Sequence, residues 1–430
     1  MRRTSWLRIV YIVLSYLLVP LLLVHLYWRS LSAPAYRQRI GERFGLGLAR
    51  QRRPSIWVHA VSVGEVQAAA PLVRALLKRH PGVPLVMTTM TPTGSARVRL
   101  LFGDAVVHSY VPYDLAAPVR WFFDRARPSL AIIMETELWP NLYHECGERR
   151  VPLVLASARI SARSLGRYRR LLPLFRDTLA NGIVIAAQTP ADAERFRSLG
   201  ANPAQTHVTG NIKFDFELPS DVLHAGRALR KLQAAERPVW VAASTHEGEE
   251  ALLLAAHMLI RQQHPRAMLF LVPRHPERFA DVAALIDSFG LAHVTRSSAA
   301  VADQRATVFL GDTMGELMTF YAAADVAFVG GSLSAIGGHN LLEPAALGIP
   351  VITGPHNENA ADIFALLVAC GAASVASDAA NVAAEVCRLF SDPEERRRRG
   401  AAGQAAITDN NGALERLLRL VDPLVSDDAG

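Results

Sequence analysis

Short apolar runs of strand length recur along this 430-residue chain, with longer amphipathic stretches between them. The first half holds five such runs: SIWVHAV, VPLVMTTM, SLAIIME, VPLVLASA and GIVIAAQ. Apolar residues with helical spacing, as over 66–80 and 115–125, separate several of them. Continuous apolar strands that alternate with helices are typical of a parallel sheet covered on both faces. The first half is therefore predicted to be an α/β domain.

The same pattern restarts in the second half of the chain. Its apolar runs are PVWVAAS, AMLFLVP, ATVFLGD, DVAFVGG and IPVITG. The stretch 217–235, with ELPSD followed by a polar helical pattern, separates the two sets and is expected to be a linker. We therefore expect an α/β protein with two Rossmann-like domains, at residues 31–220 and 221–430. Doubly wound sheets bind ligands at the carboxyl ends of their strands, so the two domains are expected to face a cleft.

Residues 1–30 differ from the rest of the chain. No side chain from residue 9 to residue 28 carries a formal charge, and about twenty apolar residues are enough to cross a bilayer. The run is too long for the apolar segment of a signal peptide, and SLSAPA after it is a poor cleavage site. We predict an uncleaved membrane anchor with a kink at Pro20. Arginines are more numerous after the run than before it, which favours a cytoplasmic location for the remaining chain.

The formal net charge of +7 and the pI of about 9.6 indicate an anionic partner. An anionic membrane and an anionic substrate both fit this charge. The sequence has no basic stripe with interleaved aromatic residues, so no nucleic acid partner is expected. Three widely spaced cysteines argue against a disulfide framework and against a cysteine-built zinc site. His246 lies near three acids without a recognised ligand spacing, and no metal is expected there.

Glu65 follows the first strand, in the stretch HAVSVGEVQAAAPL. Ser62 and Glu65 have the spacing of a capping box, and a carboxylate in a first helical turn suits the helix dipole. The local sequence therefore favours a structural role, with a proton-accepting role as the alternative. A helix N-terminus lowers the pKa of a carboxyl group and weakens it as a base, whereas burial has the opposite effect.

The stretch GGSLSAIGGHNLLEPAALGIPVITGP, residues 330–355, is typical of a nucleotide site. Glycines let backbone N–H groups approach a phosphate, and the helix that follows adds a partial positive charge. Glu343 is placed to accept hydrogen bonds from ribose hydroxyls. A tight loop with a helix start is the alternative. Arg274, at the end of another strand, is either a phosphate ligand or a solvated surface arginine.

Together these stretches resemble the 3-deoxy-D-manno-octulosonic acid (Kdo) transferases of lipopolysaccharide synthesis, from the anchor to about residue 365. The motifs that carry the resemblance are GERFG, WVHAVSVGEV, TPTGSARV, METELWPNL, SARISARS, TGNIKFD, LVPRHPERF, GDTMGEL and GGSLSAIGGHNLLEPA. It implies the GT-B architecture and an N-terminal membrane anchor. It further implies inverting transfer of Kdo from CMP-Kdo to the lipid A precursor lipid IVA at the cytoplasmic face of the inner membrane. No metal or other cofactor is implied.

The resemblance also implies roles for individual residues. Glu65 would be the general base, and Glu135 and Lys213 would stabilise the transition state. For Glu135 the alternative is a structural acid beside Trp139. The CMP-binding positions are Pro273, Arg274, Met314, Gly315, Glu316, Asn340, Leu341, Leu342 and Glu343. Leu341 and Leu342 would contribute mainly backbone groups.

The acceptor is an amphiphile, and one basic segment is a candidate to contact it. RSLGRYRRLLPLFR sets Arg163, Arg167, Arg169, Arg170 and Arg176 around an apolar stripe. Such a segment either lies on a membrane and binds lipid phosphate or is a solvated helix face. Two other functions are alternatives: a GT-B transferase that uses another nucleotide sugar, such as a UDP-hexosamine, and a membrane-anchored nucleotide-binding or lipid-binding protein without turnover.

Overall fold

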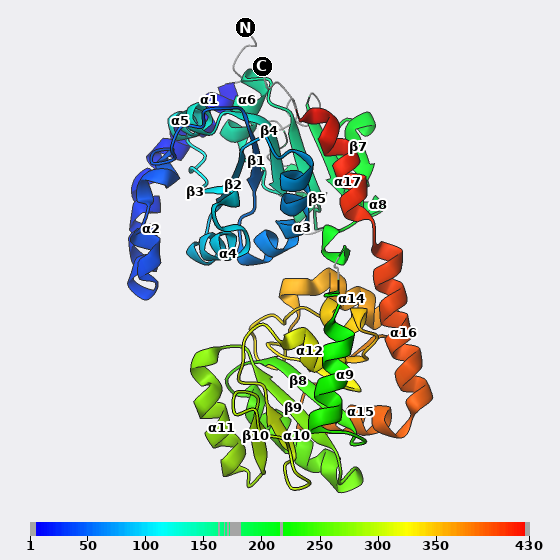
Figure 1. Cartoon of the computed structure of the whole chain (residues 1–430). Coiled ribbons are helices and arrows are strands. Elements are labelled where there is room, and N and C mark those ends of the chain that lie inside the picture. Colours follow the sequence, from blue (N-terminus) through cyan, green and yellow to red (C-terminus); the bar gives the residue numbers. More distant parts are fainter. Residues whose placement is uncertain are drawn as a thin grey trace. The chain divides into compact units, whose positions relative to one another are not determined.

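The computed structural model describes residues 6–161, 164–166, 168, 169, 172, 182–215 and 218–425. The chain divides into two compact units (Figure 1). Unit 1 comprises residues 1–216 together with 410–430, and unit 2 comprises residues 217–409.

Unit 1 contains a seven-stranded parallel sheet with the order β3-β2-β1-β4-β5-β6-β7. Its strands are β1 Ser55–His59, β2 Leu85–Thr89, β3 Val107–Tyr110, β4 Pro128–Met134, β5 Leu153–Ala158, β6 Ile183–Ala187 and β7 Thr206–Val208. The strand order reverses between β1 and β4. In a doubly wound sheet this reversal opens a crevice at the carboxyl ends of the two strands, where ligands bind.

Helices cover both faces of this sheet. They are α3 Val63–Arg79, α4 Pro92–Phe102, α5 Ala116–Ala126, α6 Pro140–Glu148, α8 Pro190–Ser198 and α17 Ala413–Val421. Because successive strand residues point to opposite faces, Trp57 packs with α5, α6 and α8, whereas Val58 packs with α3, α4 and α17. An apolar core on each face of the sheet therefore holds β1 and β4 in place.

Unit 2 has a second parallel sheet with the order β10-β11-β9-β8-β12-β13-β14. Its strands are β8 Val239–Thr245, β9 Met268–Pro273, β10 His293–Thr295, β11 Val308–Leu310, β12 Val326–Val329, β13 Val351–Thr353 and β14 Ala373–Val375. Its helices are α9 Val222–Gln233, α10 Glu249–Gln263, α11 Phe279–Ser288, α12 Leu317–Ala322, α13 Leu342–Ala346, α14 Ala361–Ala369, α15 Ala379–Ser391 and α16 Pro393–Asn410. The strand order reverses between β8 and β12, and the prediction of two Rossmann-like domains is confirmed.

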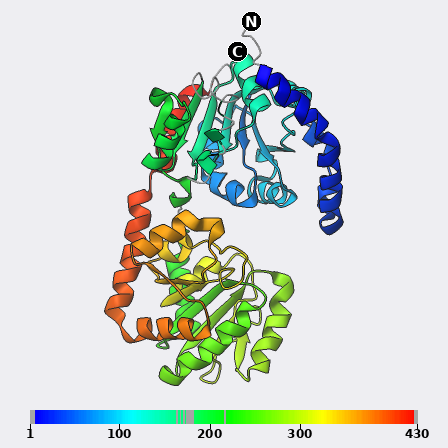
Figure 2. The ribbon, with the colours of Figure 1, turned by 180° about the vertical axis from the view of Figure 1, so that it is seen from behind.

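Two parts of the predicted organisation differ from the structure. The stretch 217–235 contains the expected helix, α9 at Val222–Gln233, but this helix is part of unit 2 and not a linker, because it packs on α12 with Gly226 against Ala322. The residues from Asn410 onward group with unit 1, whereas the expected second domain ran to residue 430. The reason is that Leu417, Leu418 and Val421 of α17 are buried in the core beside α3. In both views the red helix α17 lies beside the elements of unit 1 (Figure 1 and Figure 2).

The N-terminal apolar run forms two helices, α1 Trp6–Leu17 and α2 Val19–Ser32. Among the described residues no single helix is long and apolar enough to cross a membrane, but α1 and α2 pass this criterion together and are bent by 44°. The bend lies next to Pro20, where a kink was expected. The Tyr11 hydroxyl donates to the Asp114 carboxylate at 2.8 Å, which ties α1 to the body of unit 1.

Candidate active site

Glu65 lies in the first turn of α3, directly after β1. The Ser62 hydroxyl oxygen accepts from the Glu65 backbone N–H at 3.4 Å, and the Glu65 carboxylate accepts from the Val61 N–H at 2.8 Å. The predicted cap is therefore present in altered form, because the carboxylate accepts from the Val61 N–H and from the Ser62 hydroxyl, at 3.3 Å, rather than from the Ser62 backbone N–H. The side chain thus has a structural partner and stands at the reversal point of the sheet.

Burial raises the pKa of Glu65 from its ordinary value of 4.5 to about 7. The like charges of Glu135 and Glu137 raise it as well, while the hydrogen bonds from Val61 and Ser62 oppose the rise. Burial outweighs the helix N-terminus, as a base at this position would require. A carboxyl group that titrates near neutral pH is suited to accept a proton during a reaction.

Glu135 follows β4 and has a left-handed backbone, with φ at +55°. Its carboxylate accepts from the Lys213 ammonium at 3.1 Å and from Arg159 Nε at 3.1 Å. Burial would raise the pKa of Glu135, but these two cations together lower it. The two cations therefore favour the ionised form of Glu135, which pairs with Lys213.

A chain of amide side chains positions Lys213, which lies in the short 3₁₀ helix η5 Ile212–Phe214 after β7. Asn211 accepts from the Lys213 backbone N–H at 3.0 Å and donates to Gln188 at 3.2 Å. Gln188 in turn donates to the Ser157 carbonyl at 2.9 Å. This network of hydrogen bonds links Lys213 to β5 and to the end of β6. It holds the lysine beside Glu135, a candidate residue from a distant part of the chain.

Two further residues of this site were not singled out from the sequence, Arg159 and Glu137. The Trp139 indole N–H donates to Glu137 at 2.6 Å, so the acid bonded to the tryptophan is Glu137 and not Glu135. Burial raises the pKa of Glu137. Both residues stand inside quoted motifs, SARISARS and METELWPNL. The motifs alone reveal neither the ion pair between Arg159 and Glu135 nor the raised pKa of Glu137.

In unit 2 the candidate donor residues follow neighbouring strands of one sheet. Pro273 ends β9 and Arg274 follows it, Met314, Gly315 and Glu316 follow β11, and residues 340–343 follow β12. Strands β11, β9, β8 and β12 are adjacent in the sheet, so these residues share its carboxyl edge. The Arg274 side chain is exposed.

The two candidate acids of unit 2 have different environments. Burial raises the pKa of Glu343, while Asn340, which donates to it at 3.1 Å, and Arg274 oppose the rise. Glu316 pairs with Arg296 at 2.7 Å, and this pairing lowers its pKa. Leu341 and Leu342 are buried, and the Leu342 backbone N–H donates to the Asn340 side-chain oxygen at 3.1 Å.

A carboxylate of the same chain binds the backbone of the glycine-rich loop. The buried Glu249 carboxylate accepts from the backbone N–H groups of Gly331, Ser332 and Leu333 at 2.7, 2.9 and 2.9 Å. Successive N–H groups of this kind form an anion-binding nest. At Gly330 a Cβ atom would lie 2.9 Å from the Glu249 carboxylate, so glycine is needed for the approach. The N–H groups expected to face a phosphate therefore bind a carboxylate in this part of the loop.

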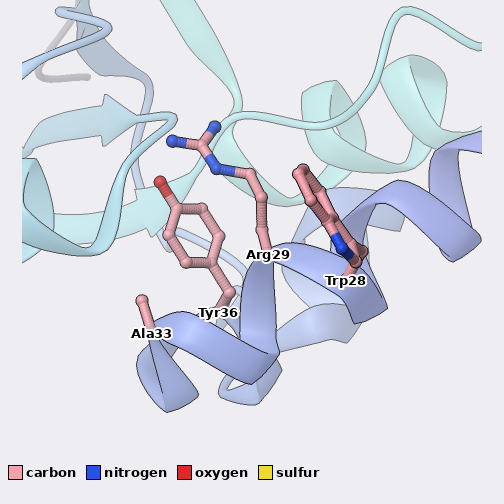
Figure 3. A pocket seen from close by; sticks show the side chains of 4 residues that line it. All are labelled: Trp28, Arg29, Ala33 and Tyr36. Carbon is pink, nitrogen blue, oxygen red and sulfur yellow. The ribbon is translucent and has the colours of Figure 1, made fainter.

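Other expectations fall outside this geometry. Of the basic segment 163–176, Arg163, Arg167, Arg170 and Arg176 lie outside the described residues. A pocket of about 300 Å³ in unit 1 is lined by Trp28, Arg29, Ala33 and Tyr36, none of which is a candidate site residue (Figure 3). Within the described ranges no group of three or more His, Cys, Asp or Glu residues is arranged to hold a metal ion.

Two Rossmann-like domains in one chain, with candidate residues at the carboxyl edge of each sheet, are the GT-B architecture. The family model described as 3-deoxy-D-manno-octulosonic-acid transferase matches residues 38–216, and the model of glycosyl transferases group 1 matches residues 242–406. The chain belongs to the Kdo transferase family and is a glycosyltransferase.

Individual proteins show the extent of the likeness. A 3-deoxy-D-manno-octulosonic acid transferase of Haemophilus influenzae is 44% identical over 94% of this chain and 95% of its own length. The relative of the same name from Bordetella pertussis is 41% identical over 90% of this chain and 91% of its own length. A glycosyltransferase structure from Rickettsia africae covers 88% of this chain and 100% of its own, with a TM-score of 0.54 at 13% identity. That last likeness concerns the fold.

Proposed function

We propose that this enzyme moves Kdo from CMP-Kdo to the lipid A precursor lipid IVA, with Glu65 as the general base. Membership of the Kdo transferase family supports the sugar that is transferred. The observation that carries the proposal is the carboxyl group of Glu65, which stands at the reversal point of the first sheet with a pKa of about 7. A base is most effective when its pKa lies near the working pH.

In the proposed step the Glu65 carboxylate takes the proton of an acceptor hydroxyl. The hydroxyl oxygen forms its bond to the anomeric carbon of Kdo as the bond from that carbon to the phosphate oxygen breaks. CMP leaves with the bonding electron pair, and the configuration at the anomeric carbon inverts. With a pKa of about 7, roughly half of Glu65 is ionised at neutral pH and ready to accept the proton.

Lys213 is proposed to stabilise negative charge in the transition state. Both the departing phosphate and the carboxylate of Kdo are anionic, and a fixed cation in a partly buried site lowers the energy of such charge. The pair with Glu135 at 3.1 Å holds the ammonium in place before the substrate arrives. Glu135 would thus act by holding Lys213 in position, and its carboxylate would also stabilise positive charge that develops on the sugar ring.

Unit 2 is proposed to bind the CMP part of the donor through the loops after β11, β9 and β12. Arg274 is an exposed guanidinium at the end of β9, suited to a phosphate. Glu343, partly buried beside Asn340, is suited to accept from ribose hydroxyls. Unit 1, which carries the base, is proposed to bind the acceptor.

A location at the cytoplasmic face of the inner membrane is the third part of the proposal. Its support is the set of large apolar side chains that α1 and α2 leave exposed. They include Trp6, Ile9, Val13, Leu14, Leu17, Leu21, Val24, Tyr27 and Trp28. A soluble surface rarely exposes a contiguous patch of this kind. Because Tyr11 binds Asp114, the helix pair is anchored to unit 1 on one side and offers its apolar side to lipid.

The test is mass spectrometry of lipid IVA after incubation with CMP-Kdo and the full-length protein in detergent. Wild type should add Kdo, and Glu65→Gln should lose activity by about 10²- to 10⁴-fold while still binding CMP. Ser62→Ala is the matched control, because it removes the cap hydroxyl and keeps the carboxylate. Near-normal turnover by Glu65→Gln would refute the base. Competition by UDP in place of CMP would move the donor to another nucleotide sugar.

A further inference from the structure

Three histidines gather at the carboxyl edge of the second sheet. His246 follows β8, His275 follows β9, and His339 belongs to the glycine-rich loop between β12 and α13. The Nε2 atoms of His246 and His339 are 2.7 Å apart, and their ring planes are nearly parallel, at 9°, with centroids 5.0 Å apart. The two rings therefore meet edge to edge through these nitrogens and not face to face. The His275 ring meets His246 edge-on at 5.1 Å.

A distance of 2.7 Å between two imidazole nitrogens has a defined chemical meaning. One nitrogen must donate a proton and the other must accept it, because two N–H groups would repel each other at this range. The pair therefore has a proton between its Nε2 atoms whether it is neutral or carries one positive charge. One added proton is accommodated without moving the rings, and a second is not.

The glycine loop is shaped to seat this pair. Gly331 has φ at +69°, and a Cβ atom there would lie 2.9 Å from His339 Cδ2 and 3.0 Å from His339 Nε2. The imidazole ring thus occupies the space that any other residue would fill. The carboxylate of Glu249 holds the same loop by accepting from three of its backbone N–H groups.

Burial disfavours the charged form of both histidines. Burial, with smaller effects of His246, Arg274 and His275, lowers the pKa of His339 to about 4. Burial also lowers the pKa of His246, assisted by His275 and Arg274 and opposed by Glu249 and Glu250. Both acids are already engaged, since Glu249 binds the loop and Glu250 binds Arg278 at 2.5 Å.

Arg274 completes the surroundings of the pair. Its side chain is exposed, and no ion pair of its guanidinium is found among the described residues. The site thus combines an exposed cation with imidazole groups. The carboxylates near it have partners, since Glu277 pairs with His275 at 3.8 Å and Glu343 accepts from Asn340 at 3.1 Å. An anion bound beside Arg274 would favour the charged form of the His246–His339 pair.

We propose that the His246–His339 pair and Arg274 form the subsite for the phosphate of the donor, and that the pair takes up one proton when the phosphate binds. This inference rests on the proposed function, in which unit 2 binds the CMP part of the donor. It adds two binding residues and couples donor binding to pH. A positive imidazole pair also stabilises the phosphate as it leaves with additional negative charge.

The experiment is titration calorimetry of the full-length protein in detergent with the methyl ester of CMP. This phosphodiester has no proton to lose or gain near neutral pH and lacks the carboxylate of Kdo, so it isolates the phosphate. Binding is measured at pH 6.5 in two buffers of different ionisation enthalpy, with cytidine as the ligand without phosphate. We expect net proton uptake with the ester and none with cytidine.

His246→Asn and His339→Asn should each abolish the proton uptake and weaken binding of the ester by about ten- to a hundredfold, the weight of one charge-assisted hydrogen bond. His264→Asn, at the end of α10 and bonded to Ser391, is the matched control and should change neither. Wild-type binding without proton uptake would overturn the inference and leave the donor assignment intact. Failure of the wild type to bind the ester at all would overturn both.

Discussion

Replacing Glu65 by glutamine tests whether this side chain is a base or a helix cap, because the two roles predict opposite effects on stability. In the wild type the Glu65 carboxylate accepts from the Val61 N–H at 2.8 Å. Glutamine keeps the size of the side chain and an oxygen that can accept this hydrogen bond. It removes the charge. A base held at a raised pKa makes the folded protein less stable at high pH, so its removal should increase stability.

The magnitude follows from the pKa of about 7 against the ordinary 4.5. Below pH 4.5 the carboxyl group is protonated in both states and costs nothing. As the pH rises through about 7 the folded state must ionise a group that the unfolded state ionises more easily. The difference of about 2.5 pKa units, at 1.36 kcal/mol each, gives about 3 kcal/mol at pH 8. At pH 5.5 the same relation gives about 1.4 kcal/mol.

The stability gain of Glu65→Gln should therefore be larger at pH 8 than at pH 5.5 by about 2 kcal/mol. Solvent screening of a partly exposed carboxylate makes this figure an upper bound.

Urea unfolding followed by tryptophan emission is the assay. It reports mainly on unit 1, which holds Trp6, Trp28, Trp57, Trp121 and Trp139, whereas unit 2 holds Trp240. Ser62→Ala, the control for the cap, should lose about 1 kcal/mol at pH 5.5 and more at pH 8, where its hydroxyl donates to an ionised Glu65; this is opposite in sign to the gain of Glu65→Gln. If Glu65→Gln is destabilised equally at both pH values and still transfers Kdo, the carboxylate is a cap and the argument from its pKa is refuted.

Three further predictions follow from the same contacts. The pH dependence of kcat/KM for Kdo transfer should rise through about 7, and Glu137→Gln should move the midpoint to lower pH because one like charge is removed; an unchanged midpoint contradicts this coupling. Lys213→Met should lower the single-turnover rate by about 10²- to 10³-fold and leave CMP affinity unchanged in calorimetry, since the lysine belongs to unit 1. Glu249→Gln should remove the carboxylate that the backbone N–H groups of Gly331, Ser332 and Leu333 share, and so destabilise the loop by about 3 kcal/mol. Hydrogen exchange of these three amides should become faster. Unaltered exchange would show that the carboxylate does not hold the loop.

Much of the fold follows from local pattern. A buried parallel strand must be apolar on both faces, so SIWVHAV and PVWVAAS identify their strands without any knowledge of the partners. The exceptions are segments whose place depends on what they pack against. The stretch 217–235 contains a helix that belongs to unit 2, and Ala413–Val421 returns to unit 1, because in each case an apolar face fits a distant core.

The sequence by itself determined which residues stand at strand ends, because periodicity and motif order place Glu65, Glu135 and Arg274 after their strands. Only the tertiary structure decided their chemistry. The pKa of Glu65 depends on burial and on carboxylates some seventy residues away, and the Lys213–Glu135 pair joins residues 78 positions apart. Glu249 reaches a loop 82 positions further along, where it takes the N–H groups that a reading of the glycines assigns to phosphate. Charge and desolvation act through space, so only the folded chain fixes their values.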